Sequence, residues 1–164
     1  MGDTVLIKHG IVHDAVLEKP YAADILVENG KITRIESGID AATLRMGAKV
    51  LDVAGMQVYP GFVEAHCHLG LDGYAVGFEG ADYNEMTDAI TPQLSAVDGL
   101  NPQDESIRLA REGGVTCVAA GPGSSNVLGG TFTVYKTVGK RIDDMVIKEK
   151  AAMKCAFGEN PKLC

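Results

Sequence analysis

The stretch PGFVEAHCHLG, residues 60–70, decides the fold and the chemistry expected of this chain. A short apolar run ends there in two of the four histidines, His66 and His68, one residue apart. Successive strand side chains point to opposite faces, so both imidazoles should lie on one side and Cys67 on the other. Two neutral histidine nitrogens that reach one point form half of a divalent metal site, and a bound metal can turn water into a nucleophile.

The part of the chain before this stretch is predicted to be rich in strands. Two alternating runs, 24–28 and 31–35, flank Asn29-Gly30, a pair that suits the positive φ angles of a type I′ hairpin turn. Further extended runs lie at 5–7, 11–12, 50–53 and 56–59. The pattern predicts a small β-sandwich-like domain over residues 1–59.

From residue 60 the rhythm changes to strand, helix, strand. Residues 62–66 are expected to be a strand, and residues 69–100 a long loop with a short helix. Asn101-Pro102 has the features of a helix start and Gly113-Gly114 those of a helix end. Strand patterns follow at 115–120, 131–136 and 153–157. Strands separated by helices indicate parallel pairing in an α/β domain, with functional groups at the carboxyl ends of the strands.

Composition narrows the class of protein. Apolar residues make up 46% of the 164 residues and charged residues 23%, which is typical of a soluble globular protein. The net charge of −7, with scattered basic residues, argues against a nucleic-acid partner, and no apolar run is long enough for a membrane span. No secretory leader precedes the strands, and the four cysteines lack metal-site spacing. We expect reduced, buried thiols and a cytoplasmic protein.

Three segments in fixed order resemble the N-terminal part of the metal-dependent amidohydrolase superfamily, in its imidazolonepropionase-like and dihydroorotase-like forms. They are residues 23–32, residues 51–62 and the pair His66 and His68. A lone His-x-His is a weak signal, but after a β-rich leader and a Pro-Gly strand it is specific. The detailed resemblance covers residues 4–70, and residues 113–116 resemble the entry to the second barrel strand.

The resemblance implies a fold, a cofactor and an activity. It implies a small β-domain beside a TIM-type (β/α)8 barrel, with His66 and His68 as first-strand ligands of a divalent metal, zinc by expectation. The family hydrolyses non-peptide C–N bonds in small amides or cyclic amides. It usually has an acidic residue two positions before the first histidine, and here that residue is Glu64.

The length of the chain departs from the family pattern. A complete barrel takes about 250 residues, whereas residues 60–164 hold about three βα units. The later histidines of the family, and the Asp that handles the proton of the attacking water, have no counterpart here. We therefore expect an N-terminal fragment with an incomplete barrel and little turnover of its own.

Two residues compete for the next position in the site. Glu159 lies where a third barrel strand would deliver a carboxylate, and some superfamily members use a Glu from that region; otherwise it is a turn carboxylate before Asn160-Pro161. Lys154 is the rival, because many family members bridge two metals with a carboxylated lysine. That lysine usually comes from the fourth strand, so a solvated or salt-bridged Lys154 is expected. The predicted metal ligands are His66, His68 and Glu159.

Other candidates have plainer readings beside the functional ones. The turn at 121–126 could line a substrate pocket with backbone N–H groups, or simply be a flexible turn. Acidic residues of the long loop could reach the site, but a solvated loop is the simpler reading; they are Asp72, Glu79, Asp82 and Glu85. His9 and His13 are expected on the surface of the β-domain. An alternative function is a non-catalytic metal-binding or assembly module, whose unpaired strand edge favours self-association.

Overall fold

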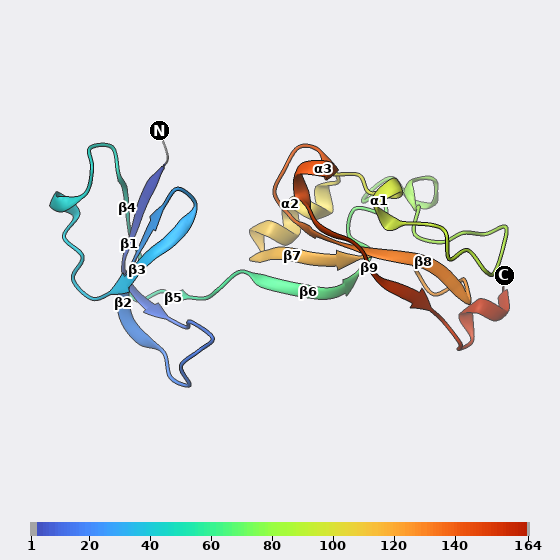
Figure 1. Ribbon diagram of the computed structural model, residues 1–164, viewed down its shortest axis with the longest axis horizontal. Coiled ribbons are helices and arrows are strands. Elements are labelled where there is room, and N and C mark those ends of the chain that lie inside the picture. Colours follow the sequence, from blue (N-terminus) through green and yellow to red (C-terminus); the bar gives the residue numbers. More distant parts are fainter. Residues whose placement is uncertain (1–2, 164) are drawn as a thin grey trace. The chain divides into compact units, whose positions relative to one another are not determined.

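The computed structural model describes residues 3–163, and the chain divides into two compact units, one up to Pro60 and one from Gly61 (Figure 1). The division lies one residue beyond the predicted boundary between residues 59 and 60. Each unit has its own sheet, so the chain is a mixed α/β structure with two sheets and short helices.

The first unit is a five-stranded sheet in the order β3-β2-β1-β4, with β5 paired to β1. Its elements are β1 (Thr4–Val12), β2 (Tyr21–Glu28), β3 (Lys31–Glu36), the 3-10 helix η1 (Ala41–Thr43), β4 (Lys49–Asp52) and β5 (Gln57–Val58). The predicted hairpin is confirmed, because Asn29 and Gly30 have φ angles of 53° and 75° between β2 and β3. The strand predictions for this unit are confirmed as a set.

Apolar side chains cover both faces of this sheet. One cluster contains Leu6, Leu26 and Ile39, and a second contains Val12, Ala23 and Ile25. Neighbouring residues of β2 fall in different clusters, as the pleat of a strand requires. Within the described residues of this unit the strands form one sheet, where the sequence predicted the two sheets of a sandwich.

The second unit has a four-stranded sheet in the order β6-β7-β8-β9. Its elements are β6 (Phe62–Cys67), η2 (Phe78–Gly80), α1 (Ala96–Gly99), α2 (Glu105–Glu112), β7 (Val115–Ala120), β8 (Leu128–Lys136), α3 (Ile142–Met145), β9 (Val146–Cys155) and η3 (Asn160–Leu163). Strands β6 and β7 are parallel and are joined through α2, as the sequence predicts. The pairs β7–β8 and β8–β9 are antiparallel.

The prediction of parallel pairing is therefore wrong beyond β7. Residues 121–127 separate β7 from β8, and a crossover back to a parallel neighbour needs a dozen or more residues. A turn of this length reverses the chain, so β8 runs antiparallel. Strand β9 also begins earlier than predicted, at Val146, because it pairs with β8 along most of its length.

Helix α2 begins three residues after the predicted start. Asp104 caps it by accepting a hydrogen bond from the backbone N of Ser106 at 2.8 Å. Asn101 instead forms the turn before the helix, since its Oδ1 accepts from the backbone N of Gln103 at 3.0 Å. The predicted end is confirmed, because Gly113 follows the last turn and Gly114 has a φ of 92°.

The core of the second unit lies between α2 and the sheet. Its largest fully buried side chain is Tyr135, packed with residues of the long loop, α2 and β7; the cluster is Leu71, Ala96, Leu100, Ile107, Val118, Ala120, Tyr135 and Met145. Three cysteines of residues 3–163 are free thiols: Cys67 half-buried, Cys117 buried and Cys155 exposed, so burial of Cys155 was wrongly expected. Cys164 lies outside the described residues.

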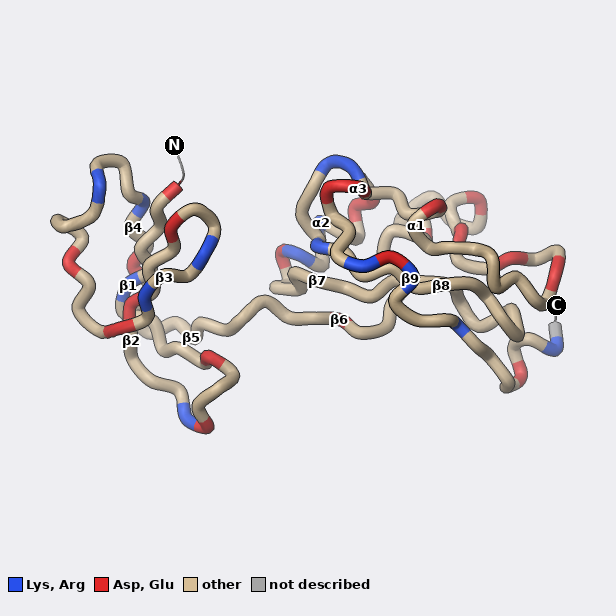
Figure 2. The backbone as a smooth tube through the Cα atoms, in the orientation of Figure 1, with Lys and Arg blue, Asp and Glu red and all other residues tan. Residues whose placement is uncertain are grey.

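Charged residues of both signs are interspersed along the two units (Figure 2). None of the helices formed by residues 3–163 has the length and apolar character to span a bilayer. The expectation that the chain has no nucleic-acid partner stays a prediction.

Candidate metal centre

His66 and His68 lie at the carboxyl end of β6, where the strand leaves the sheet. Their ring centres are 5.9 Å apart and the ring planes are perpendicular. Cys67 between them packs against the core instead, and its thiol faces the carbonyl oxygen of Ala119 at 3.6 Å. Burial raises the pKa of the Cys67 thiol, so this sulfur is not poised as a thiolate ligand. The strand alternation therefore presents two imidazoles and hides the thiol.

The ring of His68 is held from two directions. Its Nδ1 lies 2.7 Å from the carbonyl oxygen of Gly121, at the end of β7. A carbonyl can only accept, so Nδ1 carries the proton and donates it, and Nε2 keeps its lone pair. The ring also stacks on Tyr83, with centres 5.1 Å apart and planes inclined by 18°.

His66 meets a lysine at its other ring nitrogen. Its Nε2 lies 3.3 Å from Nζ of Lys154, on β9. An ammonium group donates and cannot accept, so Nε2 of His66 is the acceptor with its lone pair exposed to the cation. The edge of the ring packs against Phe132, with centres 5.2 Å apart. Nε2 of His68 is therefore on the ring edge away from its hydrogen bond, whereas Nε2 of His66 faces the lysine.

These features fit a divalent metal. Imidazole nitrogens lie about 2.1 Å from a bound zinc, which limits the centres of two rings on one ion to about 6.5 Å. The observed 5.9 Å is within that limit. A proton donated from Nδ1 to a carbonyl is the usual way in which a protein orients a histidine ligand. Along residues 3–163 no group of three His, Cys, Asp or Glu side chains comes together, so the protein offers two histidines and a lysine here.

Lys154 is the residue that the sequence placed wrongly. It was expected to be solvated or salt-bridged, yet the residue is 9% exposed and its Nζ faces His66. A hollow of about 370 Å³ opens beside the two side chains, lined also by Phe132 and small residues of β6, β7 and β9. The lysine stem is buried along this hollow, and its cationic head is directed at the histidine lone pair.

Several known proteins are similar to this chain over most of its length. No family model matches the chain. The amidohydrolase tasK of Hapsidospora irregularis is 34% identical over an alignment of 154 positions, which covers 87% of this chain and 16% of that protein. A dihydroorotase of Ruminiclostridium cellulolyticum is 33% identical over 140 residues, 85% of this chain and 26% of that protein. The crystal structure of an amidohydrolase from Thermotoga maritima MSB8 matches 96% of this chain and 40% of its own, with 40% identity and a TM-score of 0.87.

Over most of its own length the chain is similar to part of these amidohydrolases. It spans well under half the length of each of these relatives. The resemblance found in the sequence at residues 4–70 is thus confirmed at the level of the family.

Other predicted site residues lie outside the histidine pair. Glu159 is on an exposed turn, with 80% of its side chain accessible, and it pairs with Lys162 at 2.7 Å. Its role as a metal ligand stays a prediction. Glu64 accepts a hydrogen bond from the backbone N of His66 at 2.9 Å, so it supports the strand end next to the ligand.

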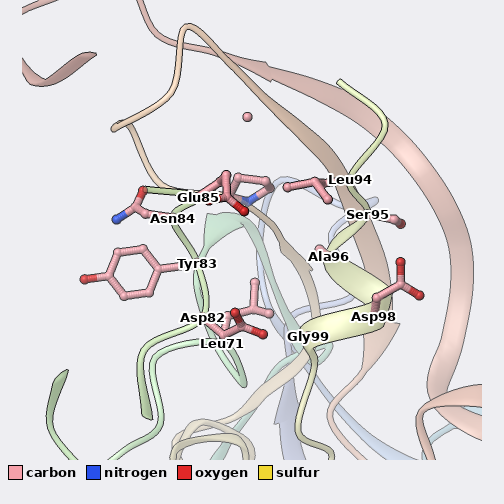
Figure 3. A pocket seen from close by; sticks show the side chains of 12 residues that line it. Leu71, Asp82, Tyr83, Asn84, Glu85, Leu94, Ser95, Ala96, Asp98 and Gly99 are labelled. Atoms are coloured by element: carbon pink, nitrogen blue, oxygen red, sulfur yellow. The ribbon is translucent and has the colours of Figure 1, made fainter. Parts of the chain in front are cut away.

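The long loop forms most of the wall of a second hollow, of about 230 Å³ (Figure 3). Asp82, Glu85 and Asp98 are among its lining residues. Glu85 accepts from both the side chain and the backbone of Thr87, and these bonds lower the pKa of its carboxyl. Asp82 and Glu85 therefore line a separate hollow and Asp72 lines another, while Glu79 lies on η2; none of them joins the histidines in a three-residue cluster of the described chain.

The turn at 121–126 takes part in the site through a carbonyl, where the sequence suggested backbone N–H groups. Sequence reasoning missed Tyr83 entirely; a lone aromatic within the polar run 81–85 was the available signal. The histidines of the first unit are apart from this chemistry. His9 is exposed and pairs with Asp52, while His13 is half-buried and stacks on Tyr59.

Proposed function

We propose that this chain supplies the first-strand metal ligands of a metal-dependent amidohydrolase that hydrolyses non-peptide C–N bonds in small amides or cyclic amides. The observation that supports it most directly is the pair His66 and His68, with 5.9 Å between ring centres, Nδ1 of His68 bonded to a carbonyl and Nε2 of His66 facing Lys154. Relatives named amidohydrolase and dihydroorotase support the reaction class.

The metal is proposed to be a divalent ion, zinc first. Bound zinc polarises a carbonyl and lowers the pKa of its water to about 7. His66 and His68 hold it, and Lys154 takes the third position once it has lost its positive charge, by deprotonation or carboxylation. Glu159 is the alternative third ligand, although in this structure its carboxylate is paired with Lys162.

The fold of the second unit supports a further proposal. Strand β6, helix α2 and strand β7 form one parallel βα unit with the histidines at its carboxyl end, where the active sites of (β/α)8 barrels lie. We assign this unit to the beginning of such a barrel. Since the chain spans 16–40% of the compared relatives, the general base and further ligands are proposed to come from segments beyond these residues. The 164-residue chain alone should then have little or no turnover.

Metal titration of the purified chain tests the proposal. We expect about one equivalent of zinc or cobalt to bind, and binding to be lost in the double variant H66A/H68A. H13A is the matched control, since His13 is a histidine of the first unit that stacks on Tyr59. Lys154→Met and Glu159→Gln identify the third ligand by which of them weakens binding. Unchanged binding in H66A/H68A, or no binding by the wild type, contradicts the proposal.

A non-catalytic assembly module is the second candidate, and the sheet edges favour it. Strand β6 is an edge strand whose residue Val63 is 69% exposed, and β9 is the other edge, with Ile147 55% exposed. Exposed apolar edges promote pairing between chains. We propose self-association through these edges and, from the free thiols, a cytoplasmic location. Light scattering over a range of concentrations tests it: a monomer throughout argues against the module.

A further inference from the structure

We propose that Tyr83 is a positioning residue that fixes the ring of His68 for metal binding, and that Asn126 holds the loop of Tyr83 in place. The inference rests on the proposed function, because it assigns His68 as a metal ligand. It concerns a tyrosine of the long loop that has no role in the metal chemistry itself.

The contacts of His68 show why a single partner does not fix both the position and the plane of its ring. The hydrogen bond from Nδ1 to the carbonyl of Gly121, at 2.7 Å, fixes one ring atom. It leaves the ring free to tilt about that atom, and a tilt moves Nε2 on the far side of the ring. The near-parallel stack on Tyr83, with planes inclined by 18°, removes this tilt. Together the two contacts define both the position and the plane of the imidazole.

Tyr83 is itself tied to the turn that holds His68. Its carbonyl oxygen accepts from the backbone N of Gly123 at 2.6 Å, two residues after the carbonyl that accepts from the histidine. Both partners of His68 are therefore fixed to one short piece of backbone. Figure 3 shows the ring of Tyr83 on the opposite side of its loop from the carboxylates of Asp82 and Glu85, although Tyr83 is also among the residues that line the hollow.

Asn126 fastens the following residues of the loop. The residue is completely buried, and its Nδ2 donates to the carbonyl oxygens of Glu85 at 2.7 Å and Asp88 at 2.8 Å. Its Oδ1 accepts from the backbone N of Glu85 at 3.3 Å. A buried amide that satisfies three backbone groups of one loop fixes that loop against the turn. The consequence is a chain of contacts from Asn126 through Tyr83 to His68.

The expected effect is a loss of metal affinity out of proportion to any loss of stability. Removing an outer partner of a metal-bound histidine lowers affinity by about 10- to 100-fold. We expect about tenfold weaker zinc binding for Tyr83→Leu, which lacks the aromatic face, and less than about twofold for Tyr83→Phe, which keeps it. Tyr74→Leu is the matched control, a half-exposed tyrosine of the same loop that makes no hydrogen bond or ring stack with either histidine within the described residues.

The experiment measures zinc affinity of the 164-residue chain by competition with a chelating dye, with circular dichroism to compare folding. A second readout uses the metal-free protein: the Nδ1–H proton of His68 and nuclear Overhauser contacts between the His68 and Tyr83 rings. We expect both signals in the wild type and in Tyr83→Phe, and their loss in Tyr83→Leu. If Tyr83→Leu does not fold, two measurements still test the proposal. They are the nuclear Overhauser contacts between the His68 and Tyr83 rings in the wild type, and the zinc affinity of Asn126→Ser.

The outcomes separate the two proposals. Wild-type affinity in Tyr83→Leu, or no ring contact between Tyr83 and His68 in the wild type, overturns the positioning role. If the wild type binds no zinc, the proposed function fails while the metal-free signals still report whether Tyr83 orients His68. Equal losses of affinity in Tyr83→Leu and Tyr74→Leu would show a merely structural effect.

Discussion

Replacing Asp24 by Asn should destabilise the first unit, because this carboxylate fastens two backbone segments. The residue is 3% exposed on β2. Oδ1 accepts from the backbone N of His9 at 2.8 Å, and Oδ2 accepts from that of Ile39 at 2.9 Å. His9 is held there with a φ of 62°, in the left-handed region, at a bulge of β1. The carboxylate thus stabilises a strained strand position and anchors the segment that carries Ile39 into the core.

The expected loss of stability follows from the two carboxylate oxygens of Asp24, each of which accepts one hydrogen bond. An asparagine amide has one oxygen, so one backbone N–H keeps a weaker bond and the other faces an NH2 group. Losing a hydrogen bond to a charged acceptor while leaving a buried donor unpaired costs about 2–3 kcal/mol. Asp40→Asn is the control, since Asp40 caps η1 from an exposed position, where its Oδ1 accepts a hydrogen bond from the backbone N of Ala42.

The pKa of Asp24 determines how the stabilisation by its carboxylate changes with pH. Burial pushes the pKa of Asp24 upward, but the N–H groups of His9 and Ile39, with the charges of Lys8 and His9, outweigh it and hold the pKa below its usual 3.8. The stabilisation is therefore complete above about pH 4 and is lost as the pH falls through the folded-state pKa.

Urea unfolding followed by circular dichroism, with amide exchange of Leu26, measures the difference between wild type and Asp24→Asn. The gap should be about 2–3 kcal/mol at pH 7 and should shrink below about pH 4, as the wild type loses its advantage. A gap at pH 7 no larger than that of Asp40→Asn would refute the reasoning. So would a gap that stays constant down to pH 2.

Three further perturbations have expected outcomes. Tyr135→Phe removes the hydroxyl that donates to the carbonyl of Leu69 at 2.8 Å in the core, and should cost about 1–2 kcal/mol in chemical unfolding. Gly121→Ala would bring a Cβ within 2.4 Å of the Phe132 ring, so it should cost about 1–3 kcal/mol and also weaken zinc binding, measured by calorimetry. Chelator added to the zinc-loaded chain should lower its stability by about 2.7 kcal/mol where zinc was present at 100 times its dissociation constant, and should have no effect on H66A/H68A.

Features fixed by a few adjacent residues were predictable from the sequence. The Asn29-Gly30 hairpin depends on two residues that accept positive φ, and both have it. The exposure of two imidazoles on one side of Cys67 follows from the strand period alone. These features need no knowledge of what the chain packs against.

Features decided by distant pairing were not predictable. The segment KEKAAMKC at 148–155 has three lysines and resembles a solvated strand, so Lys154 was read as a surface residue. Only the register of β9 on β8, which sets Lys154 opposite Gly130, brings this lysine toward His66. No local pattern encodes that pairing.

The position of Lys154 leads to one more prediction, because a single lone pair cannot serve two cations. Nε2 of His66 accepts from the Lys154 ammonium at 3.3 Å, which is where a metal ion would have to bind. The lysine must therefore either compete with the metal or become uncharged and join it. Our assignment of Lys154 as third ligand predicts weaker zinc binding by Lys154→Met, by about tenfold or more.

If Lys154 instead competes with the metal, Lys154→Met should bind zinc more tightly than the wild type, because the methionine side chain fills similar space without a charge. Zinc titrations of wild type and Lys154→Met, each with and without added bicarbonate, separate the two. Tighter binding by Lys154→Met would contradict the ligand role and leave Lys154 as a built-in cation that occupies the histidine in the metal-free state. An increase of wild-type affinity with bicarbonate that is absent in Lys154→Met would identify the uncharged form as the carbamate.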